Sequence, residues 1–241
     1  MIITAAEPAC PRRWCEPHAI HDLRRRWRIA ALRRGGRRLA FIAGCARSGT
    51  SLLKQLMAVF RNTAVFPKER PVWHILEMAG AAEATLVVKR TADCHRSLHR
   101  LPTAVELVYC VRHPYDVLTS SHPLSVHLRP YHVTRERWFA EWHALRRLRR
   151  RQPGRRIATV RYEDLVCRPD DVQAAIAAHL GLGFEQPFSA NTLGVEIRPT
   201  SLEKWRTRPE LRRYLAGLDP AWHAEIARFC AEFGYATGGL G

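Results

Sequence analysis

The chain has 241 residues, with 39 Lys and Arg against 22 Asp and Glu and a formal net charge of +17. Hydrophobic residues make up 46% and charged residues 25%, which is typical of a globular protein of one or at most two domains and excludes collagen-like, disordered and small disulfide-rich chains. No apolar stretch approaches the roughly 18 residues that a membrane-spanning helix needs, and the N-terminus lacks the pattern of a secretory signal, so neither is expected.

The positive charge is almost entirely arginine, because lysine stands only at positions 54, 68, 89 and 204. A net charge of this size suggests a polyanionic partner such as nucleic acid. An arginine bias spread over a whole chain also arises from codon composition alone, so both interpretations stay open. The seven cysteines are odd in number and scattered, with no C-x-x-C pair, which favours reduced thiols in a cytoplasmic protein over a disulfide framework or a zinc site.

Residues 1–36 are basic and irregular, and we expect them to form an N-terminal extension. The apolar residues at positions 20, 23, 27, 30 and 31 predict one face of a short helix there, with its arginine run exposed to solvent. The adjacent glycines 35 and 36 are expected to end this helix. No composition break, repeat or low-complexity linker follows, so residues 37–241 are predicted to form a single domain.

This second part of the chain alternates between strand and helix patterns. Short apolar runs predict strands at 39–43, 85–88, 105–111 and 156–160. Helical spacing predicts helices at 52–60, 114–121, 134–150, 169–181 and 220–233. Such alternation predicts an α/β fold: a P-loop-like, three-layer domain with a central parallel sheet flanked by helices.

The first candidate site is the loop after the first predicted strand. The strand ends at Gly44, and the loop Arg47–Ser51 leads into an apolar helix. Successive backbone N–H groups at such a turn face one point, and the helix dipole adds partial positive charge, so the loop is suited to bind phosphate or sulfate. The phosphate loop of nucleoside triphosphatases reads G-x-x-x-x-G-K-[ST]. Gly44 and Gly49 keep its spacing, but Thr50 replaces the lysine, and the cation of the loop is Arg47.

A second candidate site follows the strand predicted at 105–111. The sequence continues with Arg112-His113-Pro114 and reaches Ser120 eight residues after the arginine. Arg112 then stands at the carboxyl end of a strand and Ser120 two turns into the next helix. Side chains in these two places can hold a phosphate from two sides.

Both motifs resemble those of a known family. Arg47–Leu53 reads RSGTSLL and is similar to the 5′-phosphosulfate loop, R-S-G-T-[TS]-L-L, of sulfotransferases that use 3′-phosphoadenosine-5′-phosphosulfate (PAPS), in their bacterial, carbohydrate and tyrosyl-protein branches. The motif at Arg112 resembles the 3′-phosphate element of the same family, R-[DNH]-P. Three weaker likenesses are YEDL from Tyr162, SLEKW at 201–205 and Gly234-Tyr235. The resemblance runs from about residue 39 to residue 235.

The resemblance implies an enzyme that moves a sulfuryl group by in-line displacement from PAPS to an acceptor hydroxyl or amine and releases 3′-phosphoadenosine-5′-phosphate (PAP). It implies a small-molecule or glycan acceptor, no metal, no specific nucleic acid and no membrane span. The residues that it assigns to the donor are Arg47, Ser48, Gly49, Thr50, Ser51, Arg112, Ser120, Tyr162, Ser201, Lys204 and Trp205. Some relatives carry a further arginine four residues after the serine, where this chain has Leu124, so other cations are expected to help.

Catalysis needs cations for the leaving group and a base for the acceptor. Arg47 lies in the loop, and Lys89 ends a predicted strand and matches a family lysine. In the tyrosyl-protein branch a glutamate some twenty residues after the loop arginine is the base, and here Glu69 stands 22 residues on. The cytosolic branch uses a histidine two residues after the lysine, but this chain has Thr91. The alternative bases are His74, His95 and His122.

Two other functions stay open from the sequence. A P-loop-type small-molecule kinase would use the same loop, although the lysine that such enzymes place at position 50 is absent. A non-catalytic protein that binds nucleic acid or another polyanion would use the +17 charge and would not need Arg47 or Ser120.

Overall fold

The computed structural model describes residues 15–123, 125–199 and 202–236. Its centre is a sheet of five strands in the order β2-β3-β1-β4-β5, in which every neighbouring pair is parallel. The strands are β1 (Arg38–Gly44), β2 (Thr63–Glu69), β3 (Thr85–Lys89), β4 (Glu106–Val111) and β5 (Ile157–Arg161). Four of them match the strands expected from apolar runs.

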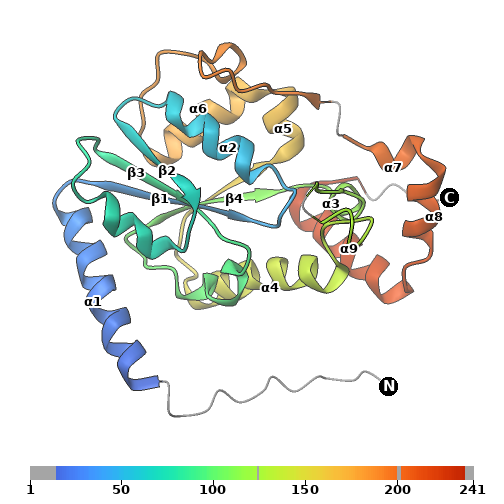
Figure 1. The fold of residues 1–241 in the computed structure, drawn as a ribbon, viewed down its shortest axis with the longest axis horizontal. Coiled ribbons are helices and arrows are strands. Elements are labelled where there is room, and N and C mark those ends of the chain that lie inside the picture. The colour runs from blue at the N-terminus through green and yellow to red at the C-terminus, as the bar shows by residue number, and fades with distance from the viewer. Residues whose placement is uncertain (1–14, 124, 200–201, 237–241) are drawn as a thin grey trace.

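Helices cover both faces of the sheet, with α2, α5 and α6 on one side and α1 and α4 on the other (Figure 1). The helices are α1 (Cys15–Arg34), α2 (Thr50–Leu56), α3 (Pro114–Leu118), α4 (Arg135–Arg151), α5 (Tyr162–Cys167), α6 (Pro169–Leu180), α7 (Lys204–Thr207), α8 (Pro209–Ala216) and α9 (Pro220–Phe233). Short 3-10 helices cover Met57–Val59, Val72–Met78, Cys94–Arg96, Leu98–Arg100 and Phe188–Ala190. The predicted three-layer α/β fold is confirmed.

The two faces of the central strands pack into two separate apolar cores. Phe41 of β1 belongs to the core that contains Trp138 and Trp142 of α4, whereas Ile42 belongs to the core that contains Leu53 of α2 and Ile176 of α6. Successive residues of a strand point to opposite faces, so a strand covered on both sides must be apolar throughout. This explains why the inner strands are visible in the sequence as continuous apolar runs.

Strand β2 is absent from the sequence-based prediction. It lies at the edge of the sheet, its residues are half-buried or exposed, and its pairing with β3 shifts between Val65 and Glu69. It also contains Pro67. Proline has no N–H to donate and is tolerated at edges and irregularities of sheets. Because β2 is covered only in part, it lacks the continuous apolar run that marks the inner strands.

The first helix buries a different face from the one expected. Leu23 and Trp27, placed on its buried face by the apolar pattern, are each 66% exposed, whereas Ile29 is fully buried in the core under the sheet. Arg26 donates to Asp22 within the helix and to the carbonyl oxygen of Arg100 in the domain. The burial of Ile29 and the bond to Arg100 hold the helix against the domain. The division of the chain at residue 36 stays a prediction.

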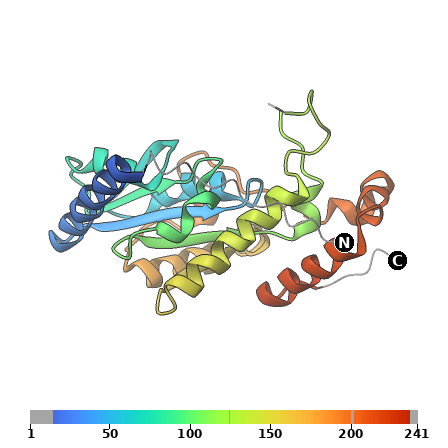
Figure 2. The same ribbon diagram turned by 90° about the horizontal axis from the view of Figure 1, so that it is seen from below.

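The connection between α3 and α4 stands out from the body of the molecule, as the lime-green segment of Figure 2 shows. It leaves the sheet at the carboxyl end of β4, on the same edge as the loop after β1. In the sheet, β1 lies between β3 and β4. A crevice forms where chain connections leave in opposite directions, and ligands of open α/β sheets bind there.

Candidate functional site

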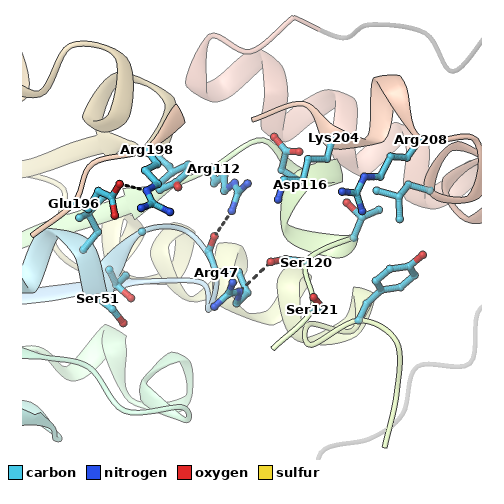
Figure 3. Close-up of a pocket in the computed structure, with 17 residues that line it drawn as sticks. Arg47, Ser51, Arg112, Asp116, Ser120, Ser121, Glu196, Arg198, Lys204 and Arg208 are labelled. Carbon is cyan, nitrogen blue, oxygen red and sulfur yellow. Dashed lines mark hydrogen bonds and ion pairs between the residues drawn. The ribbon is translucent and has the colours of Figure 1, made fainter. Parts of the chain in front are cut away.

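A cavity of about 580 Å³ lies at this edge of the sheet. It is formed by the loop between β1 and α2, by α3 with the segment after it, by Tyr162 at the start of α5, and by residues that precede and follow α7 (Figure 3). Its lining consists of Arg47, Gly49, Thr50, Ser51, Leu52, Arg112, Asp116, Thr119, Ser120, Ser121, Tyr131, Tyr162, Glu196, Arg198, Lys204, Arg208 and Leu211. Eight of the residues that the resemblance assigned to the donor are in this set.

The loop between β1 and α2 depends on glycine at two positions. Gly44 has φ 137°, and a Cβ there would lie 2.3 Å from the carbonyl oxygen of Cys110 on the neighbouring strand. Gly49 has φ 85°, and its Cβ would lie 2.5 Å from the ring of Tyr162. Arg47 between them also has positive φ, 67°, a conformation that costs a side-chain-bearing residue free energy. The loop is therefore held in an uncommon shape with Tyr162 directly against its backbone.

The two candidate anion-binding elements contact each other through their arginines. Nε of Arg47 donates to Oγ of Ser120 at 2.9 Å, and Nη1 of Arg112 donates to the carbonyl oxygen of Arg47 at 3.0 Å (Figure 3). The Arg112 guanidinium also lies 4.4 Å from the centre of the Tyr162 ring, within the range of a cation–π contact. Burial and the nearby charge of Arg112 lower the pKa of Arg47. Two like charges in one partly buried place favour an anion between them.

Lys89 reaches this loop from the end of β3. Its side chain is almost fully buried, and its ammonium donates to Oγ of Ser51 at 2.7 Å and forms an ion pair with Glu69, the residue that faces it on β2. Burial lowers the pKa of Lys89, and the bond to Glu69 opposes that effect. Lys89 and Glu69 do not line the cavity themselves, and Ser51 joins them to it.

Ser48 and Trp205 are buried residues that lie behind the cavity wall. Ser48 is 2% exposed in the loop, and Trp205 is 2% exposed in α7. The Trp205 ring stacks on His113 with 5.5 Å between ring centres and meets Tyr115 edge-on at 4.9 Å. Trp205 thus packs α7 against α3, while the next residue toward the N-terminus, Lys204, faces the cavity. Ser201 lies outside the described residues.

Several lining residues have no counterpart among the predicted site residues. The most notable are Asp116, Arg198 and Arg208. Asp116 is 3% exposed and accepts a hydrogen bond from the backbone of Glu203, and burial raises its pKa to about 6. Arg198 forms an ion pair with Glu196 at the wall. Arg198 and Arg208 add two cations to the cavity wall, and neither lies in a recognisable motif, so only the fold could show them.

The alternative bases do not lie on the cavity. His74 pairs with Glu77 at 2.6 Å, and His95 lies 3.7 Å from the buried Glu141, with its pKa lowered to about 4 by burial. The His122 ring packs on His132 at 4.7 Å, beside the segment that carries Ser121. None of the three histidines lines the cavity in the described part of the chain.

In the part of the chain that the structure describes, no group of three or more His, Cys, Asp or Glu is arranged to hold a metal ion. No helix of 15–123, 125–199 and 202–236 has the length and apolar character needed to cross a bilayer. The cysteines at 45, 94, 110, 167 and 230 are all free thiols.

Comparisons with known proteins point to one family. Residues 97–186 match the model of the sulfotransferase family. The structure is similar to the sulfotransferase domain from the Synechococcus PCC 7002 olefin synthase, with a TM-score of 0.61 and 20% identity over 83% of this chain and 95% of that one. It is also similar to the sulfotransferase domain from the curacin biosynthetic pathway, with a TM-score of 0.60 and 18% identity over 83% of this chain and 98% of that one. The comparison with curated proteins gives no match.

Proposed function

We propose that the chain transfers a sulfuryl group from PAPS to an acceptor hydroxyl or amine, because residues 97–186 match the sulfotransferase family model and the fold is similar to that of two sulfotransferase domains. The observation that carries the proposal is the contact between the two anion-binding elements. Arg47 bonds to Ser120 and Arg112 bonds to Arg47, so both elements face one cavity. A donor with a phosphosulfate at one end and a 3′-phosphate at the other matches this pair of elements.

We assign the phosphosulfate end to the loop Arg47–Ser51 and the 3′-phosphate end to Arg112 and Ser120. The loop fits an anion, because Gly49 lets the backbone turn with a positive φ into α2, and Thr50 and Ser51 line the cavity with hydroxyl groups. Hydrogen bonds from arginine to phosphate are charge-assisted and among the strongest in proteins. Lys204 adds a further cation to the cavity wall, and the ring of Tyr162 packs against the guanidinium of Arg112.

The proposed chemistry forms a bond from the acceptor oxygen or nitrogen to sulfur and breaks the bond from sulfur to the phosphate oxygen of the donor. Negative charge grows on that phosphate oxygen, so a cation at this place lowers the barrier. Arg47 lies in the loop, and Lys89 reaches the same place through Ser51. Both are fixed by hydrogen bonds before the reaction, which lowers the cost of orienting them. We assign them to stabilising the leaving group.

Glu69 is the proposed base that takes the proton of the acceptor. Lys89 contacts its Oε1 atom, and we assign Oε2 to the acceptor proton. The carboxylate is half-exposed, so a substrate can approach it, and its ion pair fixes its direction. General-base catalysis of this kind is commonly worth about 10²–10⁴ in rate. The acceptor is a small molecule or a glycan with a hydroxyl or amine group.

The first test is binding of PAP. At about 100 times its dissociation constant, PAP is expected to stabilise the folded state by about 2.7 kcal/mol and to raise the unfolding temperature by about 5–10 °C. Arg47→Ala is expected to remove this shift. Arg61→Ala is the matched control, because Arg61 is exposed and pairs with Glu185 away from the cavity. Absence of any PAP-dependent stabilisation of the wild-type protein would contradict the proposal.

The second test is transfer itself. Labelled PAPS is incubated with a panel of alcohols, phenols, amines and glycans, and transfer of label to at least one acceptor is expected. ATP with Mg²⁺ serves as the comparison for a P-loop kinase, and duplex DNA serves for a polyanion-binding protein. Tight ATP binding without PAP binding, or DNA binding that Arg47→Ala leaves unchanged while PAP has no effect, would favour those functions instead.

A further inference from the structure

Two cations of the cavity, Lys204 and Arg208, come from a short segment far along the chain from the two anion-binding elements. α7 has four residues, too few for a helix that is stable by itself. Glu203, just before it, has φ 50°, a left-handed backbone that is unfavourable for a side-chain-bearing residue. The position of both cations therefore depends on contacts with the rest of the molecule.

One such contact is a hydrogen bond to Asp116. The backbone N–H of Glu203 donates to Oδ2 of Asp116 at 3.0 Å, and Asp116 is 3% exposed. Asp116 lies in α3, four residues after Arg112 and four before Ser120. Asp116 and Lys204 both line the cavity (Figure 3). This bond therefore joins the start of α7 to the element that carries the proposed 3′-phosphate site.

The other contact is apolar. The Trp205 ring is buried between His113 and Tyr115, which flank the start of α3. The Glu203 side chain forms an ion pair with Arg206, with 2.9 Å between Oε1 and Nε, so the acidic group of the turn is paired with a residue of α7. Trp205 thus fixes the middle of the segment, and Asp116 fixes the turn before it.

Asp116 carries its charge at an unfavourable place for an enzyme with an anionic donor. A carboxylate on the cavity wall repels phosphate, although the nearby charge of Arg112 favours its charged form. The bond from the backbone N–H of Glu203 indicates a further role, because a carboxylate is a strong acceptor for the N–H of a strained turn. We infer that Asp116 is a positioning residue that holds Lys204 and Arg208 against the phosphate-binding side of the cavity, an inference that rests on the proposed function.

Asparagine separates the two effects of Asp116. Its amide oxygen can still accept the N–H of Glu203, but its charge is gone. Asp116→Asn is therefore expected to bind PAP as tightly as the wild type or more tightly. Asp116→Ala lacks the acceptor and is expected to bind PAP about tenfold more weakly. With labelled PAPS, Asp116→Ala is expected to raise KM about tenfold and to change kcat less than threefold.

The matched control is Asp219→Ala. Asp219 accepts the backbone N–H of Ala221 at 2.7 Å at the start of α9, so it makes the same kind of bond outside the cavity. It is expected to leave PAP affinity unchanged. A background with Lys204→Ala and Arg208→Ala supplies the second control. Because Asp116 acts through those two cations, Asp116→Ala is expected to cause no further loss of affinity there.

Hydrogen exchange tests the positioning without nucleotide. In Asp116→Ala the backbone amides of 203–208 are expected to exchange faster than in the wild type, and in Asp116→Asn at the wild-type rate. Should Asp116→Ala fail to fold, Asp116→Ser replaces it with the same expectations. If the wild type does not bind PAP, the proposed function fails, and the exchange comparison still decides whether Asp116 holds the segment.

Three results would overturn the inference. One is wild-type PAP affinity and exchange in Asp116→Ala. Another is an equal loss in Asp116→Asn and Asp116→Ala, which would mean that the carboxylate contacts the donor directly. The third is a full additional loss when Asp116→Ala is added to the background without Lys204 and Arg208.

Discussion

At the scale of single residues, the loop after β1 is the part of the molecule least able to accept change. Gly49 combines a positive φ with the ring of Tyr162 where its Cβ would be. Tyr162 in turn supports Arg112. Because Gly49 has no side chain, the backbone of the loop can lie directly against the Tyr162 ring, and this ring in turn contacts the Arg112 guanidinium.

Gly49→Ala is expected to lower the free energy of unfolding by about 1–3 kcal/mol, because alanine is strained at this φ and its Cβ displaces Tyr162. PAP affinity is expected to fall more than tenfold, since Arg112 moves with the ring. Calorimetric titration and urea unfolding measure the two effects. Gly80→Ala is the control, because nothing lies within 4 Å of a Cβ there. Equal behaviour of the two variants would show that the loop tolerates a side chain at position 49.

The ion pair of Glu69 and Lys89 gives a second prediction at this scale. Glu69→Gln is expected to reduce kcat for sulfuryl transfer about 100-fold or more and to leave KM for PAPS nearly unchanged, since the amide cannot take a proton.

The control for Glu69 is Glu77→Gln, a carboxylate that pairs with His74 outside the cavity. Its kcat is expected to equal that of the wild type. A Glu69→Gln enzyme that keeps the kcat of the wild type would show that the base is another group.

At the scale of elements, α3 is the structural centre of the site. It starts at the carboxyl end of β4, and His113 caps it by accepting the backbone N–H of Tyr115 with Nδ1 at 3.3 Å. The same short helix carries Asp116 and packs against Trp205. A substitution that destabilises α3 is therefore expected to displace residues on both walls of the cavity.

Burial holds the pKa of His113 at about 4, below the ordinary value of about 6.5. In the unfolded chain the ring binds a proton as the pH falls below about 6.5, but in the folded protein it does not. The contribution of neutral His113 is thus fully present above pH 6.5 and is lost toward pH 4, by about 1.4 kcal/mol per pH unit. Asparagine can cap the helix but does not titrate. His113→Asn is therefore expected to lose less stability between pH 7 and pH 5.

Urea unfolding of the wild type and of His113→Asn at both pH values measures this difference. His95, also buried with a pKa of about 4, titrates in both proteins, so its contribution cancels. Parallel losses of stability in the two proteins would mean that His113 is protonated without cost in the folded state.

At the scale of the whole molecule, the path of the chain places the site. β1 lies at the middle of the sheet with β3 and β4 on its two sides, so the loops that follow β1, β3 and β4 leave from the same edge. This is why the sequence alone could bring Arg47, Lys89 and Arg112 together. Each ends or follows a strand that is buried on both faces and therefore visible as an apolar run.

The remaining parts of the site depend on contacts that local sequence does not record. Arg198 lies in an irregular segment and Arg208 between α7 and α8, and both reach the cavity from a part of the chain far in sequence from its other walls. The buried face of α1 is decided by Ile29 and by polar contacts of Arg26 rather than by its most apolar stripe. Periodicity cannot detect either effect, because both are set by partners distant in the sequence.

Only a few of the 39 Lys and Arg residues line the cavity. Others hold the fold: Arg90 and Arg137 donate to the buried carboxylate of Glu141, and Arg155 donates to the carbonyl oxygens of Leu101 and Pro102. A large net charge is therefore compatible with three separate uses, in the site, in the core and on the surface. It is no guide by itself to what the protein binds.

The segment between α3 and α4 has a consequence for the cavity. It stands away from the body (Figure 2), yet it supplies Ser121 and Tyr131 to the cavity wall. Its return is fixed by the bond from the backbone N–H of His132 to the carbonyl of Ser120. Loops on a rigid scaffold can be replaced without disturbing it. Exchange of the part of this loop that follows Ser121 would thus change one wall of the cavity and leave Arg47, Arg112 and Ser120 in place.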